Sequence, residues 1–280
     1  MTLWRPQDFK TAALTAGGAP QVVANAVESA RILRTKTPGT QPIFSLRHLA
    51  HLVGVDYRCL REVTSRKVEP YRVFRINKRS LPRETVRFRT VVVPSAWLMA
   101  LQRWININIL DIVPPHHASV AFSKGDSIRE AAAAHCNCQW LIKLDIRNFF
   151  ESITERQVYY VFEAIGYQPL VAFELARLCT RVGALRTRRS YPRYKNNGSS
   201  SIAISSYYSA VMGHLPQGAP TSPRIANLVA RDLDARLAAI ADERGLTYTR
   251  YADDLIFSTK DKALSRTAVR TLIGRIYKTI

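Results

Sequence analysis

Negative charge is scarce in this 280-residue chain, which contains 21 Asp and Glu against 41 Lys and Arg, a formal net charge of +20. A folded protein with so much like charge repels itself, and a bound polyanion relieves that repulsion through the release of counterions. The basic residues recur along the whole chain rather than in one tail. The charge therefore predicts a nucleic-acid partner, with a ribosomal-type basic protein or a merely solvated surface as the alternative.

Cysteines and long apolar runs are also few. Four cysteines do not make a disulfide framework in a chain of this length, so we expect a reducing, cytoplasmic location. The first 20 residues lack the apolar core of a secretory signal, and no run of about 18 uncharged apolar residues occurs, so we expect no membrane partner. These absences exclude a secreted miniprotein and a membrane protein. A hydrophobic content of 47% argues against disorder.

Periodicity predicts both helices and strands. Apolar residues at helical spacing indicate helices at residues 20–35, 46–53, 97–110, 128–134, 154–179 (interrupted at Gly166 and Pro169) and 222–240. Alternating patterns indicate strands at residues 71–76, 85–93, 140–146, 246–250 and 255–258. Ser45 and Ser222 are expected to cap the helices that follow them, and Gly245 to close the last helix. Residues 186–206 are basic and then rich in Asn, Gly and Ser, which predicts a mobile loop.

Three of the scarce acids stand at the ends of apolar segments. Asp145 ends a run that we expect to be a buried strand, and Asp253 with Asp254 occupies the turn between two further strands. Adjacent carboxylates repel one another and are costly to bury unpaired, and divalent cations would remove both penalties. Three carboxylates from neighbouring strands can hold two Mg²⁺ ions roughly 3.5–4 Å apart, which suits phosphoryl transfer. For the Asp pair alone, a turn stabilised by local hydrogen bonds is the alternative.

A rigid bend precedes the helix predicted at residues 222–240. Residues 215–223 read LPQGAPTSP, in which prolines and a glycine lead directly into a helix N-terminus. Such a bend lets the backbone approach a ligand closely, and the helix end favours anionic groups.

Three segments in chain order carry a resemblance to a known family. Residues 143–150 (KLDIRNFF), 215–223 and 250–255 (RYADDL) resemble the three palm motifs of reverse transcriptases. Upstream, residues 45–60, 71–78 (YRVFRINK), 89–94 (RTVVVP) and 101–103 (LQR) resemble the fingers motifs of bacterial retron-type enzymes. The resemblance covers about residues 45–260. It implies an α+β fold of the right-hand polymerase type.

The resemblance also implies roles for single residues. Asp145, Asp253 and Asp254 would be the catalytic residues and would hold two Mg²⁺ ions, with the backbone carbonyl of Ile146 as a further ligand. Phe150, five residues after Asp145, would be the steric gate beneath the incoming sugar and would favour deoxynucleotides. Viral RNA-dependent RNA polymerases typically place a second Asp at that spacing, so Phe150 favours DNA synthesis.

Four further residues are expected to contact the nucleotide. Gln217 and Gly218 would shape the pocket beside the templating base. The resemblance also implies that Arg89 and Lys78 would hold the triphosphate, and the donor fork of the Arg89 guanidinium suits phosphate oxygens.

The resemblance implies an arrangement of domains as well. We expect an N-terminal helical extension at residues 1–40, fingers at 41–140 and a palm at 141–280, with inserted helices and a loop at about 155–214. We expect this chain to lack most of the thumb. Either the chain is truncated, or a separate chain supplies the thumb.

A retron assignment implies a specific product and specific partners. The enzyme would copy part of a cognate structured non-coding RNA into RNA-linked single-stranded DNA (msDNA), using dNTP substrates, and would act in anti-phage defence with an effector protein. Retron enzymes typically show an Asn-Ala-x-x-His pattern before the first palm motif, and this chain has Ala131 in place of the Asn and keeps His135. A reverse transcriptase of another bacterial class, such as the group II intron type or another defence system, is therefore the first alternative. The second is a non-catalytic RNA-binding scaffold on the same fold.

Overall fold

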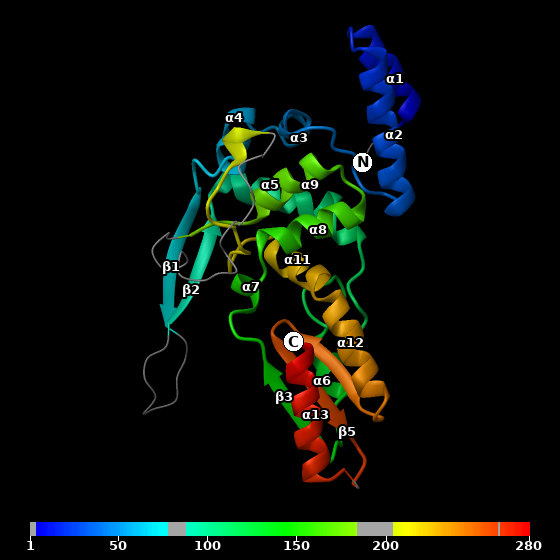
Figure 1. Cartoon of the computed structure of the whole chain (residues 1–280), viewed down its shortest axis with the longest axis vertical. Helices are drawn as coiled ribbons and strands as arrows, with labels where there is room; N and C mark the ends of the chain where they lie inside the picture. The colour runs from blue at the N-terminus through cyan, green and yellow to red at the C-terminus, as the bar shows by residue number, and fades with distance from the viewer. Residues whose placement is uncertain (1–3, 78–87, 184–203, 263) are drawn as a thin grey trace. The chain divides into compact units, whose positions relative to one another are not determined.

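The computed structural model describes residues 4–77, 88–183, 204–262 and 264–280 (Figure 1). These residues form a two-stranded sheet, a three-stranded sheet and numerous helices, and this confirms the predicted α+β class. The chain divides into two compact units, which are described separately below. The first consists of Met1–Val113 with Ile153–Ser222, and the second of Pro114–Ser152 with Pro223–Ile280. No described helix combines the length and the apolar character needed to cross a membrane.

The first unit is mostly helical. Its α-helices are α1 (Pro6–Thr15), α2 (Pro20–Lys36), α3 (Leu46–Val53), α4 (Tyr57–Thr64), α5 (Ala96–Asn108), α8 (Glu155–Ile165) and α9 (Pro169–Cys179). Two short 3₁₀ helices, η1 (Leu110–Ile112) and η3 (Ser205–Tyr207), complete its helical content among the described residues. Strands β1 (Tyr71–Asn77) and β2 (Phe88–Pro94) pair antiparallel, and they correspond to the strands predicted at residues 71–76 and 85–93 (Figure 1).

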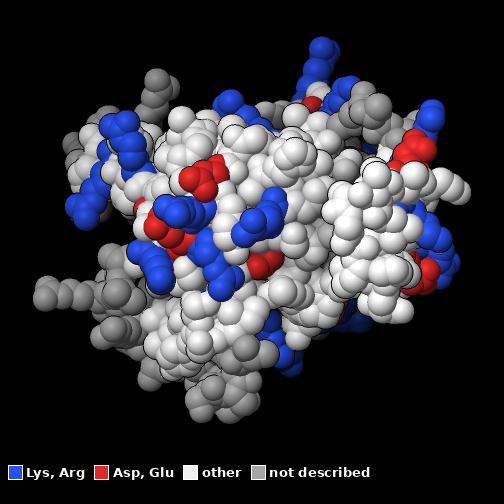
Figure 2. Space-filling model, turned by 90° about the horizontal axis from the view of Figure 1, so that it is seen from above, with Lys and Arg blue, Asp and Glu red and all other residues white. Residues whose placement is uncertain are grey.

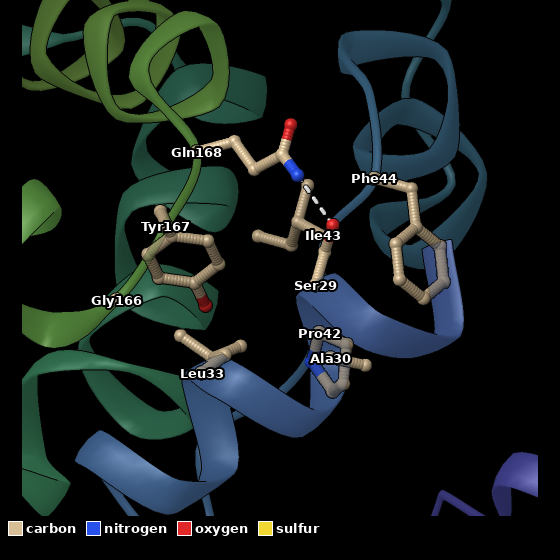
Figure 3. A pocket seen from close by; sticks show the side chains of 9 residues that line it. All are labelled: Ser29, Ala30, Leu33, Pro42, Ile43, Phe44, Gly166, Tyr167 and Gln168. Atoms are coloured by element: carbon tan, nitrogen blue, oxygen red, sulfur yellow. Dashed lines mark hydrogen bonds between the residues drawn. The ribbon is translucent and has the colours of Figure 1, made fainter. Parts of the chain in front are cut away.

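Helix α2 packs closely against the link between α8 and α9. Gly166 in that link has φ +118°, and a Cβ atom added there would lie 3.0 Å from the Cα atom of Leu33 on α2. The side-chain amide of Gln168 donates a hydrogen bond to the hydroxyl of Ser29 (Figure 3). The cavity that remains between these segments has a volume of about 10 Å³. The helix predicted at residues 20–35 is therefore an integral part of the first unit.

A buried charge network joins α4, α8 and α9. The carboxylate of Glu155, at the start of α8, accepts from Arg66 at 2.5 Å and from Arg177 at 2.8 Å. It also accepts from the backbone N–H of Gly213 at 3.0 Å. Burial alone would raise the pKa of Glu155, but the two guanidinium groups outweigh burial and lower this pKa to about 2. The network fixes the backbone just before the predicted motif at residues 215–223.

The second unit contains the three-stranded antiparallel sheet, with strand order β3-β5-β4. Its strands are β3 (Trp140–Asp145), β4 (Thr247–Tyr251) and β5 (Asp254–Thr259), and its helices are α6 (Ile128–Ala133), α7 (Phe149–Ser152), α11 (Ser222–Val229), α12 (Arg231–Asp242) and α13 (Arg266–Thr279). Leu237 on α12 and Leu272 on α13 are buried in one cluster with Ile142, Leu255 and Phe257 of the sheet. Helices α12 and α13 therefore bury one face of the sheet and hold its strands in register.

Two predictions for the second unit need correction. The single helix expected at residues 222–240 is two helices, because Ala230 between them has ψ −2°. No Gly or Pro marks this break in the sequence. Strand β3 was expected to be buried, but Leu141, Lys143 and Asp145 are exposed, so only one of its faces is covered. Most of the predicted loop at residues 186–206, and the start of the strand at 85–93, lie outside the described residues.

Candidate active site

The three predicted catalytic residues lie at one end of the three-stranded sheet. In the β3–β5 register, Asp145 is the direct partner of Asp254. Strands β4 and β5 are joined by the two-residue turn Ala252–Asp253, and the N–H of Ile146 donates to the carbonyl of Asp253 at 2.9 Å. Directly opposed residues in an antiparallel pair have Cα atoms about 4.5–5.5 Å apart. The backbone therefore brings Asp145, Asp253 and Asp254 together.

A buried arginine anchors the turn that carries two of these acids. Ala252 has φ +56°, a left-handed conformation that costs a non-glycine residue about 1–2 kcal/mol. Its carbonyl accepts from the guanidinium of Arg250 at 3.0 Å. Arg250 also makes a bidentate ion pair with Asp234 of α12, with hydrogen bonds of 2.8 and 2.7 Å. Both side chains of this pair are fully buried. The Arg250 side chain thus links the strained turn to helix α12.

The Arg250–Asp234 pair was not predicted, although the sequence contains a signal for it. Asp234 stands three residues before Leu237 within the apolar stripe of its helix, and Arg250 interrupts a strand of apolar character. A charged residue of each sign on two faces that must be buried indicates an internal ion pair.

A lysine lies among the predicted catalytic carboxylates. The ammonium group of Lys143 contacts Asp254 at 2.9 Å, and its side chain is 58% exposed. The hydrogen bond that Lys143 donates to Asp254 raises the pKa of Lys143, and the charges of Asp254, Asp145 and Asp253 act in the same direction against the smaller effect of burial. Within the described residues, no group of three or more His, Cys, Asp or Glu side chains has an arrangement that could hold a metal ion.

The donor atoms nevertheless suit a hard divalent cation. Carboxylate oxygens are the ligands that Mg²⁺ prefers, and the backbone presents three carboxylates within one turn and its facing strand.

Phe150 lies on the short helix α7, which follows strand β3. Its side chain is half-buried, whereas that of the neighbouring Phe149 is buried. The two ring centroids are 5.6 Å apart, and the guanidinium of Arg250 lies 5.7 Å from the ring centre of Phe149. Arg250, which anchors the turn carrying Asp253, therefore also contacts the Phe149 ring.

Three of the four predicted nucleotide-contacting residues come together in the first unit. The N–H of Val92 on β2 donates to the carbonyl of Gln217 at 2.7 Å. Gly218 has φ +120°, and an added Cβ atom would lie 2.9 Å from the Cγ1 atom of Val91. Arg89 is exposed on the same strand, two residues before Val91. Lys78 lies outside the described residues.

Ser222 has a different role from the predicted one. Helix α11 begins at Ser222 itself, and the Ser222 hydroxyl donates to the carbonyl of Pro216 at 2.7 Å. The amide of Asn106 on α5 donates to the carbonyl of Pro220 at 2.8 Å. These two bonds hold the bend at residues 215–223 closed, as its prolines predict.

His135, which the retron pattern contains, is buried against the three-stranded sheet. One imidazole nitrogen contacts the hydroxyl of Ser258 and the other that of Thr249, both at 2.7 Å. Burial lowers the pKa of His135, which favours the neutral ring. Because both nitrogens are occupied, His135 joins the end of α6 to β4 and β5.

Basic side chains are distributed over a folded face rather than confined to one arm. In the view of Figure 2, Lys and Arg side chains are spread across the surface, and several lie beside acidic side chains. This distribution agrees with the interpretation of the net charge given above.

Comparisons with known proteins agree with the motif order. Residues 45–278 match the family described as "Reverse transcriptase (RNA-dependent DNA polymerase)". The chain is 32% identical to the Retron Ec86 reverse transcriptase of Escherichia coli over 227 residues, which cover 81% of this chain and 61% of that protein. It is 33% identical to the Retron Mx162 reverse transcriptase of Myxococcus xanthus over 207 residues, covering 72% of this chain and 40% of the relative. The Retron Mx65 reverse transcriptase of the same organism is 34% identical over 239 residues, with coverages of 81% and 50%.

The chain thus spans between 40% and 61% of the length of these three relatives. Among solved structures, a chain of the "Partial Cas6-RT-Cas1--Cas2 complex" is similar at 16% identity and a TM-score of 0.35, over 93% of this chain and 40% of that one. A score this low supports no inference about the present chain.

Proposed function

The chain belongs to the reverse transcriptase family and is of the bacterial retron type, and from this membership we propose that it is an RNA-directed DNA polymerase. The observation that carries the proposal is the β3–β5 register, which sets Asp145 opposite Asp254 beside the anchored turn with Asp253. A binding scaffold would have no need of three acids at one sheet end in a chain of net charge +20.

We assign the chemistry of nucleotide addition to this sheet end. Asp145, Asp253 and Asp254, with the carbonyl of Ile146, would hold two Mg²⁺ ions. When bound, such ions supply activation of the primer hydroxyl and neutralisation of charge on the triphosphate. Lys143 would release Asp254 as the site fills, and its ammonium would then be available to the phosphates.

The remaining residues bind and select the nucleotide. Arg89 would contact the triphosphate, with Lys78 as a second cation. The backbone of Gln217 and Gly218, fixed on β2, would form the wall of the nucleotide pocket. The ring of Phe150 would lie under the sugar and exclude a 2′-hydroxyl. This combination predicts a preference for deoxynucleotides.

The retron type supports a more specific proposal for the template and product. The chain would copy part of a cognate structured non-coding RNA into msDNA, in which the DNA stays linked to RNA. Its partners would be that RNA, the DNA product, and an effector protein with which it acts in anti-phage defence. Similarity to the retron enzymes and the net charge of +20 support this proposal.

Extension of a DNA primer on an RNA template by the purified full chain tests the polymerase proposal. We expect Asp254→Asn to reduce deoxynucleotide incorporation by more than about 10³-fold. The matched control is Asp242→Asn, which removes the same charge from an exposed position at the end of α12 and should leave the rate unchanged. Equal rates for the two variants would refute the assignment of Asp254.

Binding of Mn²⁺, followed by its electron paramagnetic resonance signal, tests the metal site without relying on turnover. The wild-type chain and Asp242→Asn should bind Mn²⁺ alike, and Asp145→Asn and Asp253→Asn should each bind it more weakly. If all four bind the ion equally, these carboxylates are not its ligands.

A further inference from the structure

Phe122 has a backbone conformation that phenylalanine rarely adopts. It lies in the second unit with φ +68°, in the left-handed region that disfavours large side chains. Its side chain is 44% exposed, so burial of the ring does not explain why the strain is retained. Strained residues of this kind cluster at functional sites, where surrounding contacts hold them in place.

The backbone on both sides of Phe122 is fixed by side chains of neighbouring elements. The amide of Asn227 on α11 donates to the carbonyl of Ala121 at 2.7 Å. On the other side, the guanidinium of Arg224 donates to the hydroxyl of Ser123 at 2.5 Å. These bonds join the loop to helix α11. The conformation of Phe122 is therefore imposed by its surroundings.

The Phe122 ring lies beside two residues of the candidate active site. Its centroid is 6.4 Å from that of Phe150 and 6.3 Å from that of Tyr251. Both distances fall within the range of about 4.5–7 Å at which aromatic rings attract one another. Tyr251 directly precedes the turn that carries Asp253. Phe122 thus bridges the predicted sugar gate and the catalytic hairpin.

A half-buried gate needs support from more than one side to discriminate between two sugars. The ring of Phe149 contacts Phe150 on one side, at 5.6 Å between centroids. Phe122 is the second ring in contact with Phe150 among the described residues. A gate that could turn away would admit a 2′-hydroxyl, since small displacements of a positioned group change rates strongly.

We propose that Phe122 is a specificity-determining residue that holds the ring of Phe150 in place and thereby sets the selection of deoxynucleotides over ribonucleotides. The inference rests on the proposed function, because it assumes that Phe150 contacts the sugar. Phe122 itself acts as a positioning residue. Its strained backbone is retained because only that conformation directs the ring at both Phe150 and Tyr251.

The test compares kcat/KM for a deoxynucleotide and for the matching ribonucleotide in primer extension by the full chain. Phe122→Gly removes the ring and relieves the left-handed strain, so the variant should fold at least as stably as the wild type. We expect its preference for the deoxynucleotide to fall by about tenfold or more. Phe122→Tyr keeps the ring and should retain the wild-type preference.

Asn137→Gly is the matched control. Asn137 is also a non-glycine residue of the second unit with positive φ, at +59°, and it is exposed. Replacing Asn137 by glycine relieves the same kind of backbone strain and leaves the aromatic rings around Phe150 in place. The sugar preference of Asn137→Gly should equal that of the wild type, and thermal unfolding should show both glycine variants folded.

The outcomes separate the inference from the proposed function. If Phe150→Ala relaxes sugar selection and Phe122→Gly does not, the inference about Phe122 is wrong, and the role of Phe150 as the sugar gate is still supported. If neither variant changes the preference, Phe150 is not the gate, and the inference is wrong with it. A wild-type chain that incorporates no nucleotide refutes the polymerase proposal and therefore the inference as well.

Discussion

At the scale of single residues, the turn that carries Asp253 depends on a guanidinium group that has no contact with solvent. Arg250 pairs with Asp234 in the interior and donates to the carbonyl of the strained Ala252. Removing one partner of such a pair leaves a buried charge without compensation, which costs about 3–5 kcal/mol. The pair therefore links the stability of the second unit to the position of Asp253.

We predict that Arg250→Met lowers the free energy of unfolding by about 3–5 kcal/mol in urea denaturation. Arg275→Met provides the comparison, because Arg275 makes an ion pair with Glu243 in which the side chains are 44% and 53% exposed. That exposed pair should contribute much less to stability than the buried pair, because solvent screens its charges. Similar losses for the two variants would contradict the role given to the buried pair.

A second prediction at this scale concerns Gly218. An added Cβ atom would meet Val91 at 2.9 Å and the carbonyl of Val92 at 3.0 Å, and φ is +120°. Gly218→Ala should therefore displace the bend from β2 and raise the KM for deoxynucleotides in primer extension. A Cβ atom added at Gly274 on α13 would have no neighbour within 4 Å. Gly274→Ala should therefore stabilise the chain by about 0.5–1 kcal/mol without changing the KM. An unchanged KM in Gly218→Ala would show that the bend does not shape the pocket.

At the scale of secondary-structure elements, Glu155 joins α8 to Arg66 after α4, to Arg177 on α9 and to the backbone at Gly213. Further hydrogen bonds join these segments: Arg66 donates to the carbonyl of Arg177 at 3.2 Å, and Arg177 donates to the carbonyl of Thr64 at 2.7 Å. The segment that follows Gly213 leads directly into the bend at residues 215–223. The network thus couples helix packing to the bend that is predicted to contact the nucleotide.

The folded-state pKa of Glu155, about 2, predicts a dependence of stability on pH. Because this pKa lies below the ordinary value of 4.5, the unfolded chain takes up the proton first as the pH falls. The stabilisation is complete above pH 4.5 and is lost between about pH 4.5 and pH 2, with a magnitude of about 3 kcal/mol. Urea denaturation of the wild type and Glu155→Gln across this range should show a shallower slope for the variant. Parallel slopes would contradict the ionised, paired state of Glu155.

Elements with strong local patterns could be predicted from the sequence. Ser45 caps α3, and the interruption at Gly166 separates α8 from α9, because caps and glycines act within a few residues. The break at Ala230 could not be predicted, since no residue there prevents a helix. The exposed face of β3 was also missed, because an apolar run does not show how many faces a neighbouring layer covers.

The candidate site shows the same limit. Asp145, Asp253 and Asp254 could be placed together from motif order, and Gln217 with Gly218 from the proline-rich bend. The Arg250–Asp234 pair and the left-handed conformation of Phe122 were not predicted, because both depend on contacts between segments more than ten residues apart in sequence. Long-range contacts of single side chains leave little trace in local periodicity.

At the scale of the whole molecule, the net charge of +20 predicts that RNA binding depends strongly on salt. If six to ten phosphates are contacted, affinity should fall by roughly 10³–10⁵-fold between 50 and 200 mM salt. Filter binding of a structured RNA at several salt concentrations measures this slope. An affinity independent of salt would mean that the basic residues do not contact the phosphates.

The central claim is that this chain makes DNA on an RNA template in its own cell by means of Asp253 and Asp254. Sequencing of the nucleic acid that copurifies with the native protein, with and without RNase treatment, tests this claim most directly. We predict one short DNA joined to one RNA species, and its absence from a variant carrying Asp253→Ala and Asp254→Ala. Heterogeneous RNA without DNA from the wild type, or the same DNA from the variant, would contradict the account.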